Sequence, residues 1–168
     1  EAGALFAKDS KNIFDFPQIQ AIVNINKQHL NFLKKKTLNE VIFQKVGFLS
    51  NFTNIYVGKQ SSVVLKRIKK ILSKNLSFID YSSTWKLQKI KNRFFYKSKN
   101  IKIELNSKYI HSKGLLENLC LAIKIALDFN INKKIIVNTI PKIKFQARIE
   151  YITKGKLIKK ISRNEKLL

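Results

Sequence analysis

The strongest constraint on the fold is the alternation of short apolar runs with amphipathic helical segments in the first half of the chain. Residues 20–25 and 53–58 read as compact strands, and each is followed by a helical pattern, over 37–47 and 61–75. Strands separated by helices pair in parallel through right-handed crossovers. The sequence therefore predicts an α/β domain with a mostly parallel sheet and flanking helices.

The pattern changes after the second helix. Residues 76–87 and 92–105 read as short antiparallel strands joined by a polar turn. Residues 114–130 form the longest predicted helix, and residues 131–143 form a shorter one that Pro141 strains or ends. We therefore expect a small antiparallel sheet beside the parallel one.

A domain boundary is expected near residue 144, where the last helix ends and a new strand pair begins. Residues 147–161 read as a hairpin that turns at Lys154-Gly155. The expected division is one domain over 1–143 and the first hairpin of a second domain over 144–168.

The helix predicted over 37–47 carries a lysine on its apolar face. Thr37 and Glu40 have the spacing of a capping box, and the apolar face holds Leu38, Val41, Ile42 and Leu49. Lys45 projects from the middle of that face. A buried ammonium is costly unless it is paired or chemically altered. The pattern alone favours snorkelling at the helix C-terminus, where the dipole stabilises a cation.

Two other residues interrupt their local patterns. Asn118 falls within the apolar arc predicted for the long helix, which holds Leu115, Leu119, Ala122, Ala126 and Phe129. A buried amide needs hydrogen-bond partners, which a neighbouring loop or a ligand could supply. His29 follows the first strand at its C-terminal end, where open α/β sheets bind ligands. A lone histidine there is more often structural than a ligand.

The composition favours neither a nucleic-acid binder nor a membrane protein. The formal net charge is +24, but only four of the 34 basic residues are arginine, the residue best suited to phosphates and base edges. The lysines are spread along the whole chain with abundant Ile and Asn, which indicates a solvated surface. No run of 18 apolar residues occurs. The single cysteine, Cys120, indicates a reducing, cytoplasmic location.

Six segments follow one another along nearly the whole chain in a fixed order. They are "EAGALFAKDSKN" (1–12), "VNINKQHLNFL" (23–33), "KTLNEVIFQKVGF" (36–48), "YVGKQSSVVLKRI" (56–68), "GLLENLCLAIKIA" (114–126) and "IPKIKFQARIEYITKGKL" (140–157). In order and spacing they resemble the motifs of the bifunctional folylpolyglutamate synthase/dihydrofolate synthase family of the Mur ligase superfamily. The resemblance implies the second half of that family's central ATPase domain and the start of its C-terminal domain.

The resemblance also implies a chemistry for the residues that interrupt their patterns. In this family ATP phosphorylates a pteroate or folate carboxylate, and glutamate then attacks the acyl phosphate to form an amide. Lys45 aligns with a lysine that CO₂ carbamylates into a carboxylate-like ligand of Mg²⁺. Glu1 and His29 align with further metal ligands, and Asn118 and Arg148 align with groups that hold ATP. The expected cofactors are ATP and Mg²⁺, and the expected full-length protein is a monomer.

The chain departs from the family pattern at several positions. The glycine-rich segment after Glu1 has become "ALFAK", and Gln28 and Gln44 replace two acidic residues near the expected metal site. The family's phosphate-binding loop and its D-G-A-H-N stretch are not in this sequence. We therefore expect a fragment that is inactive alone. The alternatives are a degenerate, non-catalytic relative and a basic nucleic-acid-binding module.

Overall fold

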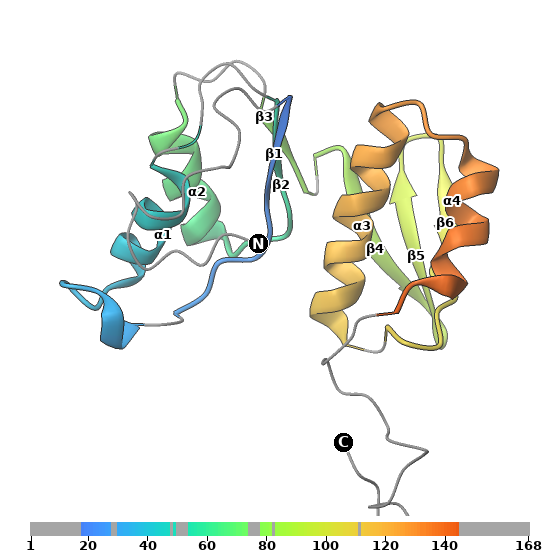
Figure 1. Ribbon diagram of the computed structural model, residues 1–168, viewed down its shortest axis with the longest axis horizontal. Coiled ribbons are helices and arrows are strands. Elements are labelled where there is room, and N and C mark those ends of the chain that lie inside the picture. Colours follow the sequence, from blue (N-terminus) through green and yellow to red (C-terminus); the bar gives the residue numbers. More distant parts are fainter. Residues whose placement is uncertain are drawn as a thin grey trace, which may run out of the picture.

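A parallel sheet of three short strands organises the first half of the molecule. The computed structural model describes residues 18–27, 30–47, 49, 54–73, 78–81, 83–110 and 112–144. Within these ranges, β1 (Ile19–Ile22), β2 (Asn54–Val57) and β3 (Phe78–Asp80) pair in parallel in the order β1-β2-β3 (Figure 1). The central strand β2 is buried on both faces, as expected for a parallel sheet covered on both sides.

Two crossover helices cover one face of this sheet. The chain passes from β1 through a 3-10 turn (Leu30–Phe32) and α1 (Leu38–Val46) to β2, and then through α2 (Ser62–Ile71) to β3. Thr37 and Ser61 cap these helices by accepting backbone N–H groups. Apolar side chains from α1, α2 and the strands form one core cluster, which includes Ile42, Ile55 and Ile68.

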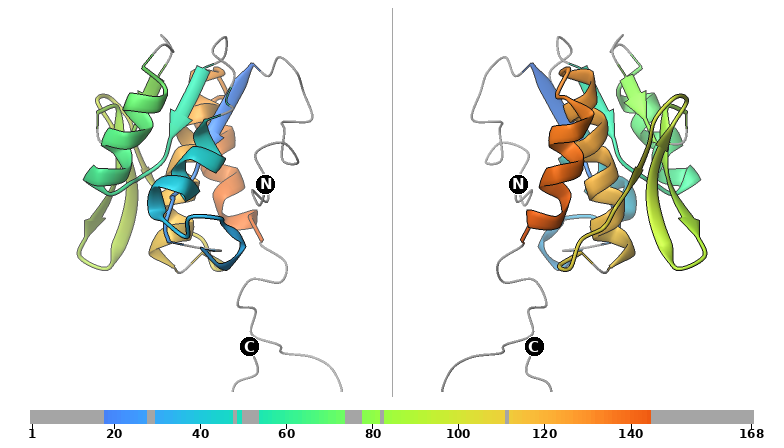
Figure 2. Two further views of the ribbon diagram at one scale, coloured as in Figure 1. Left: turned by 90° about the vertical axis from the view of Figure 1, so that its left-hand side faces the viewer. Right: turned by 90° about the vertical axis from the view of Figure 1, so that its right-hand side faces the viewer.

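The other face of the parallel sheet packs against α3 (Lys113–Asp128). This helix also contacts an antiparallel sheet of β4 (Trp85–Ile90), β5 (Arg93–Ser98) and β6 (Lys102–Glu104). A second core cluster joins Tyr56 of β2, Leu121 of α3 and Trp85 of β4. The short helix α4 (Lys133–Thr139) and a 3-10 turn (Ile140–Lys142) follow α3, and both helices lie on one face of the antiparallel sheet (Figure 2).

The α/β architecture predicted from the sequence is confirmed, with one correction to the strand pairing. Residues 78–80 were expected in the antiparallel sheet, but they form the third strand of the parallel sheet. The capping box is also only half correct, because Thr37 accepts from the N–H of Glu40 whereas the Glu40 carboxylate accepts from the N–H of Lys35. None of the helices in the described ranges has the length and apolar character needed to cross a lipid bilayer.

The expected boundary near residue 144 is at the end of the described residues. The hairpin predicted over 147–161, and with it the proposed second domain, lies outside them. The division into two domains therefore stays a prediction.

Candidate functional site

The carboxyl ends of the three parallel strands meet at one edge of the sheet. At this edge the turn Gly58-Lys59-Gln60 after β2 holds the loop that follows β1. The N–H of Gly58 donates to the carbonyl of Ile22 over 2.8 Å. The side chain of Gln60 donates to the carbonyl of Val23 over 2.7 Å and accepts from the N–H of Ile25 over 2.9 Å. Ligands of open α/β sheets bind at such an edge.

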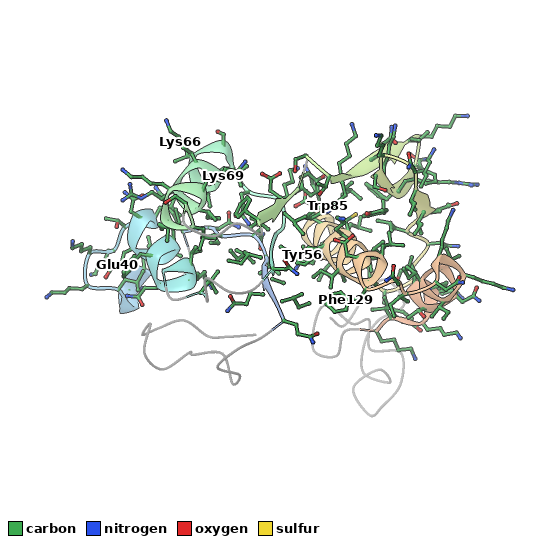
Figure 3. All side chains as sticks on the ribbon, turned by 90° about the horizontal axis from the view of Figure 1, so that it is seen from above. Glu40, Tyr56, Lys66, Lys69, Trp85 and Phe129 are labelled. Atoms are coloured by element: carbon green, nitrogen blue, oxygen red, sulfur yellow. The ribbon has the colours of Figure 1, made fainter. Side chains whose placement is uncertain are left out.

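The helix α3 runs antiparallel to β2 and begins near this edge. Two side-chain contacts fix its direction. Near the edge, Lys59 Nζ lies 3.0 Å from Glu117 Oε1. Further along, the hydroxyl of Tyr56 donates to Asp128 Oδ2 over 2.8 Å, and Figure 3 shows Tyr56 pointing from β2 toward α3. The N-terminal half of α3 therefore lies beside the carboxyl edge of the sheet.

The predicted ligand residue Asn118 lies on the flank of α3, next to Glu117. The apolar arc predicted for this helix is only partly correct: Leu115, Leu119 and Ala126 belong to the core or pack against it, but Phe129 is 47% exposed and Ala122 is also exposed. The side chains that α3 does bury are Leu116, Leu119, Cys120, Leu121 and Ile123. Asn118 itself is half-buried, and its carboxamide has no hydrogen-bond partner among the described residues.

The predicted carbamylation site Lys45 lies in the last turn of α1, and its side chain is half-buried. It makes no ion pair with any of the described acidic residues. The neighbouring Gln44 Oε1 is buried and has no hydrogen-bond partner in the part of the chain that the structure describes. Because α1 is a crossover between parallel strands, it runs from their carboxyl ends toward their amino ends, and Lys45 lies toward the amino end.

The structure thus places Lys45 and Asn118 on helices that cover opposite faces of the parallel sheet. It does not bring these two residues together. The other three predicted site residues, Glu1, His29 and Arg148, lie outside the described residues.

The described residues do not by themselves form a magnesium site. No group of three or more His, Cys, Asp or Glu side chains in the described ranges could hold a metal ion. Of the predicted ligand set only Lys45 is described, and a protonated amine has no lone pair to offer a cation.

The sequence analysis missed the acidic side chains that organise this region. Asp80 ends β3, is 7% exposed and lies 2.6 Å from Lys69 Nζ. Burial would raise the pKa of Asp80, but hydrogen bonds from Lys69 and Ser83 outweigh it and lower that pKa. The bond to Glu117 likewise raises the pKa of Lys59, against the opposing effect of burial.

The small number of acidic residues in so basic a chain was the signal that could have identified these side chains. Only ten residues of the chain are acidic, against 34 basic ones. All five acidic side chains in the described ranges accept a hydrogen bond or join an ion pair: Glu40, Asp80, Glu104, Glu117 and Asp128.

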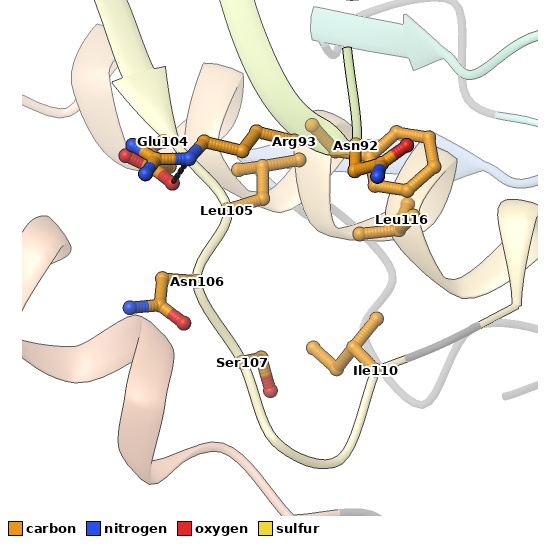
Figure 4. Close-up of a pocket in the computed structure, with 9 residues that line it drawn as sticks. Asn92, Arg93, Glu104, Leu105, Asn106, Ser107, Ile110 and Leu116 are labelled. Atoms are coloured by element: carbon orange, nitrogen blue, oxygen red, sulfur yellow. Dashed lines mark ion pairs between the residues drawn. The ribbon is translucent and has the colours of Figure 1, made fainter. Parts of the chain in front are cut away.

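A separate cavity of about 600 Å³ opens between the β4–β5 turn, the segment after β6 and the start of α3 (Figure 4). Polar and apolar residues both line it, and the apolar ones include Leu105, Ile110 and Leu116. At its rim Arg93 Nε lies 3.7 Å from Glu104 Oε1. Of the two predicted site residues that the structure describes, neither Lys45 nor Asn118 lines this cavity.

The comparisons with known proteins agree with the architecture. No protein-family model and no curated protein matches the chain. Solved structures do match it. The S73A mutant of folylpolyglutamate synthase (FPGS) from L. casei superimposes with a TM-score of 0.74 at 15% sequence identity, over 91% of this chain and 40% of that one. The chain has the fold of part of a folylpolyglutamate synthase.

Two further structures agree with this fold assignment. Folylpolyglutamate synthase from Thermotoga maritima matches with a TM-score of 0.66 at 21% identity, over 83% of this chain and 33% of that one. An FPGS complex with AMPPCP and folate matches with a TM-score of 0.68 at 15% identity, over 82% and 36%. This chain therefore spans about two-fifths of the first of these proteins and about a third of the other two. The family resemblance read from its motifs is confirmed at the level of the fold.

Proposed function

We propose that this chain is part of an ATP-dependent ligase that joins L-glutamate to the carboxylate of dihydropteroate or a tetrahydrofolate. The observation that carries the proposal is the match of 91% of the chain to folylpolyglutamate synthase. One matching structure holds AMPPCP, an ATP analogue, together with folate. In the proposed reaction, ATP passes its γ-phosphoryl group to the carboxylate and leaves as ADP. The amine of glutamate then attacks the acyl phosphate, forms the amide and releases phosphate.

The described residues best support a nucleotide-binding role for Asn118. Its carboxamide offers two N–H donors and one carbonyl acceptor, and none of these is used by a described residue. The helix that carries it begins near the carboxyl edge of the sheet, where its N-terminal dipole favours negatively charged groups. Arg148 is the second proposed nucleotide ligand, on the basis of the motif that contains it.

The motif resemblance makes Glu1, His29 and Lys45 the proposed ligands of Mg²⁺, although α1 carries Lys45 toward the amino ends of the strands, away from the edge at which Asn118 lies. Carbamylation would change Lys45 from a cation into an oxygen donor suited to this hard ion. The half-buried Lys45 side chain without an acidic partner and the unpaired carbonyl oxygen of Gln44 support a polar function in this turn. When bound, the ion would supply charge neutralisation for the phosphates.

The proposal is tested with the protein expressed from its complete reading frame. ADP formation should require both glutamate and a pteroate or folate substrate. Asn118→Ala should raise the KM for ATP about tenfold, a loss of about 1.4 kcal/mol of binding free energy, because the nucleotide loses hydrogen bonds. Asn138→Ala, which removes an exposed carboxamide from α4, is the matched control and should leave KM unchanged. ADP formation that is absent, or that needs neither co-substrate, would contradict the assignment.

A further inference from the structure

The ion pair between Lys59 and Glu117 is the contact that joins the carboxyl edge of the parallel sheet to α3. The carboxylate of Glu117 is 13% exposed and the ammonium side chain of Lys59 is 40% exposed. Lys59 Nζ also lies 6.0 Å from the centroid of the Tyr81 ring, just after β3. A carboxylate this well buried is costly without its partner, so the pair constrains the geometry strongly.

Two side-chain contacts attach α3 to β2 and to the turn that follows it. Tyr56 and Asp128 hold the C-terminal half of the helix, whereas Lys59 and Glu117 hold the N-terminal half. Eleven residues separate Glu117 from Asp128, which is about 16 Å along a helix axis. Loss of the Lys59–Glu117 pair would remove the ionic contact that sets the position of this half of the helix, while its buried Leu116, Leu119 and Leu121 keep it packed in the core.

Asn118 would move with this half of the helix, because it is the residue next to Glu117. A hydrogen bond between a carboxamide and a ligand weakens steeply when its distance or angle changes. The same pair also fixes Lys59 in the turn after β2, next to Gly58, which has little space around it. A Cβ at Gly58 would lie 3.2 Å from the carbonyl oxygen of Ile22 and 3.5 Å from Leu121 Cδ2. Sheet edge and helix are therefore close-packed at this point, with little space for an alternative arrangement.

We propose that Lys59 and Glu117 form a positioning pair, which fixes α3 against the turn after β2 and so presents Asn118 to the nucleotide. The inference rests on the proposed nucleotide-binding function of Asn118. It assigns no contact with the nucleotide to Lys59 or Glu117. Their exchange should therefore be tolerated, provided that one positive and one negative side chain remain.

A charge-exchange experiment tests the proposal. ADP affinity is measured by isothermal titration on the protein expressed from its complete reading frame, for the wild type, Lys59→Glu, Glu117→Lys and the double exchange, at a temperature where each is folded. Each single exchange should weaken ADP binding about tenfold, since it places two like charges side by side, and the double exchange should restore most of the affinity. If a charge-reversal variant does not fold, Glu117→Gln replaces it in the experiment, because this substitution removes the charge and keeps the side-chain shape.

The exposed pair between Arg93 and Glu104 provides the control. Glu104→Lys reverses a charge in the antiparallel sheet and should leave ADP affinity unchanged. Single exchanges that lower the unfolding temperature but not the ADP affinity would overturn the proposal in favour of a structural role. A double exchange that fails to restore binding would show that Lys59 contacts the nucleotide directly, which also overturns it. A wild-type protein that binds no ADP would instead refute the proposed function itself.

Discussion

The thiol of Cys120 shows at the scale of one residue how strongly the α3 core disfavours charge. Cys120 is fully buried, and it belongs to the cluster that includes Trp85 and Tyr96. Burial raises the pKa of Cys120 from 9.0 to about 12. Below pH 9 the thiol is neutral in both the folded and the unfolded chain and has no effect on stability. Above pH 9 the unfolded chain ionises first, so this residue destabilises the fold progressively up to about pH 12.

Cys120→Ala should remove this pH dependence. At neutral pH the variant should be less stable by about 1 kcal/mol, because it loses buried volume. At pH 10 the difference should shift by about 1.4 kcal/mol in favour of the variant and so reverse its sign, since only the wild type then loses stability by ionisation. The measurement is urea unfolding of both proteins at pH 7 and at pH 10. Because both contain the same lysines, the effect of lysine titration cancels in the difference between them. A difference in unfolding free energy that does not change with pH would contradict the expectation.

At the scale of secondary-structure elements, the sequence predicts the helices and strands well but not all of their neighbours. The caps at Thr37 and Ser61 and the apolar periodicity of α2 are local signals, and the structure confirms these two crossover helices within a few residues of their predicted bounds. The strand β3 has only three residues. So short a segment carries no pattern that distinguishes a parallel from an antiparallel partner, and this partner lies about 20 residues away along the chain.

The helix α3 shows why the predicted apolar arc around Asn118 was only partly correct. A helical-wheel argument assumes one buried face, whereas α3 packs between two sheets. Leu121 faces the parallel sheet near Gly58, and Cys120 belongs to the core shared with the antiparallel sheet. Glu117 and Asp128 lie outside the predicted apolar arc, yet both bond to residues of the parallel-sheet side, Lys59 and Tyr56. The periodicity of apolar residues within one helix cannot predict polar contacts with elements far away in the sequence.

The antiparallel sheet carries an unfavourable row of charges on the face turned away from its core. Lys97 of β5 is directly opposite Lys86 of β4 and Lys102 of β6, and all three are exposed. Directly opposite like charges destabilise a sheet. Lys97→Glu should therefore stabilise the protein by about 0.5–1 kcal/mol, since the central residue of the row would attract both neighbours.

Lys99→Glu is the matched control for this substitution, because it makes the same charge change just beyond the end of β5 and outside the row. Urea unfolding of the two variants and the wild type at low ionic strength gives the comparison. Equal gains from both variants would mean that the net charge, and not the alignment of the three lysines, limits stability.

At the scale of the whole molecule, repulsion among basic residues competes with a small number of ion pairs. The formal net charge is +24, whereas the described residues form four ion pairs: Lys59–Glu117, Lys69–Asp80, Arg93–Glu104 and Lys124–Asp128. Exposed ion pairs contribute little, typically below about 1 kcal/mol. A large net charge instead destabilises the compact state through self-repulsion that extends over the whole surface.

Added salt should therefore stabilise this protein. Raising NaCl from about 0.02 M to about 0.3 M shortens the screening length from about 20 Å to about 6 Å, which removes most of the repulsion between distant lysines. The partly buried pairs at Glu117 and Asp80 are screened less and should persist. The urea midpoint should rise over this range, and a neutral osmolyte at equal osmolality controls for effects that are not ionic. A midpoint that falls with salt would mean that attraction within the few ion pairs outweighs the repulsion of the whole chain.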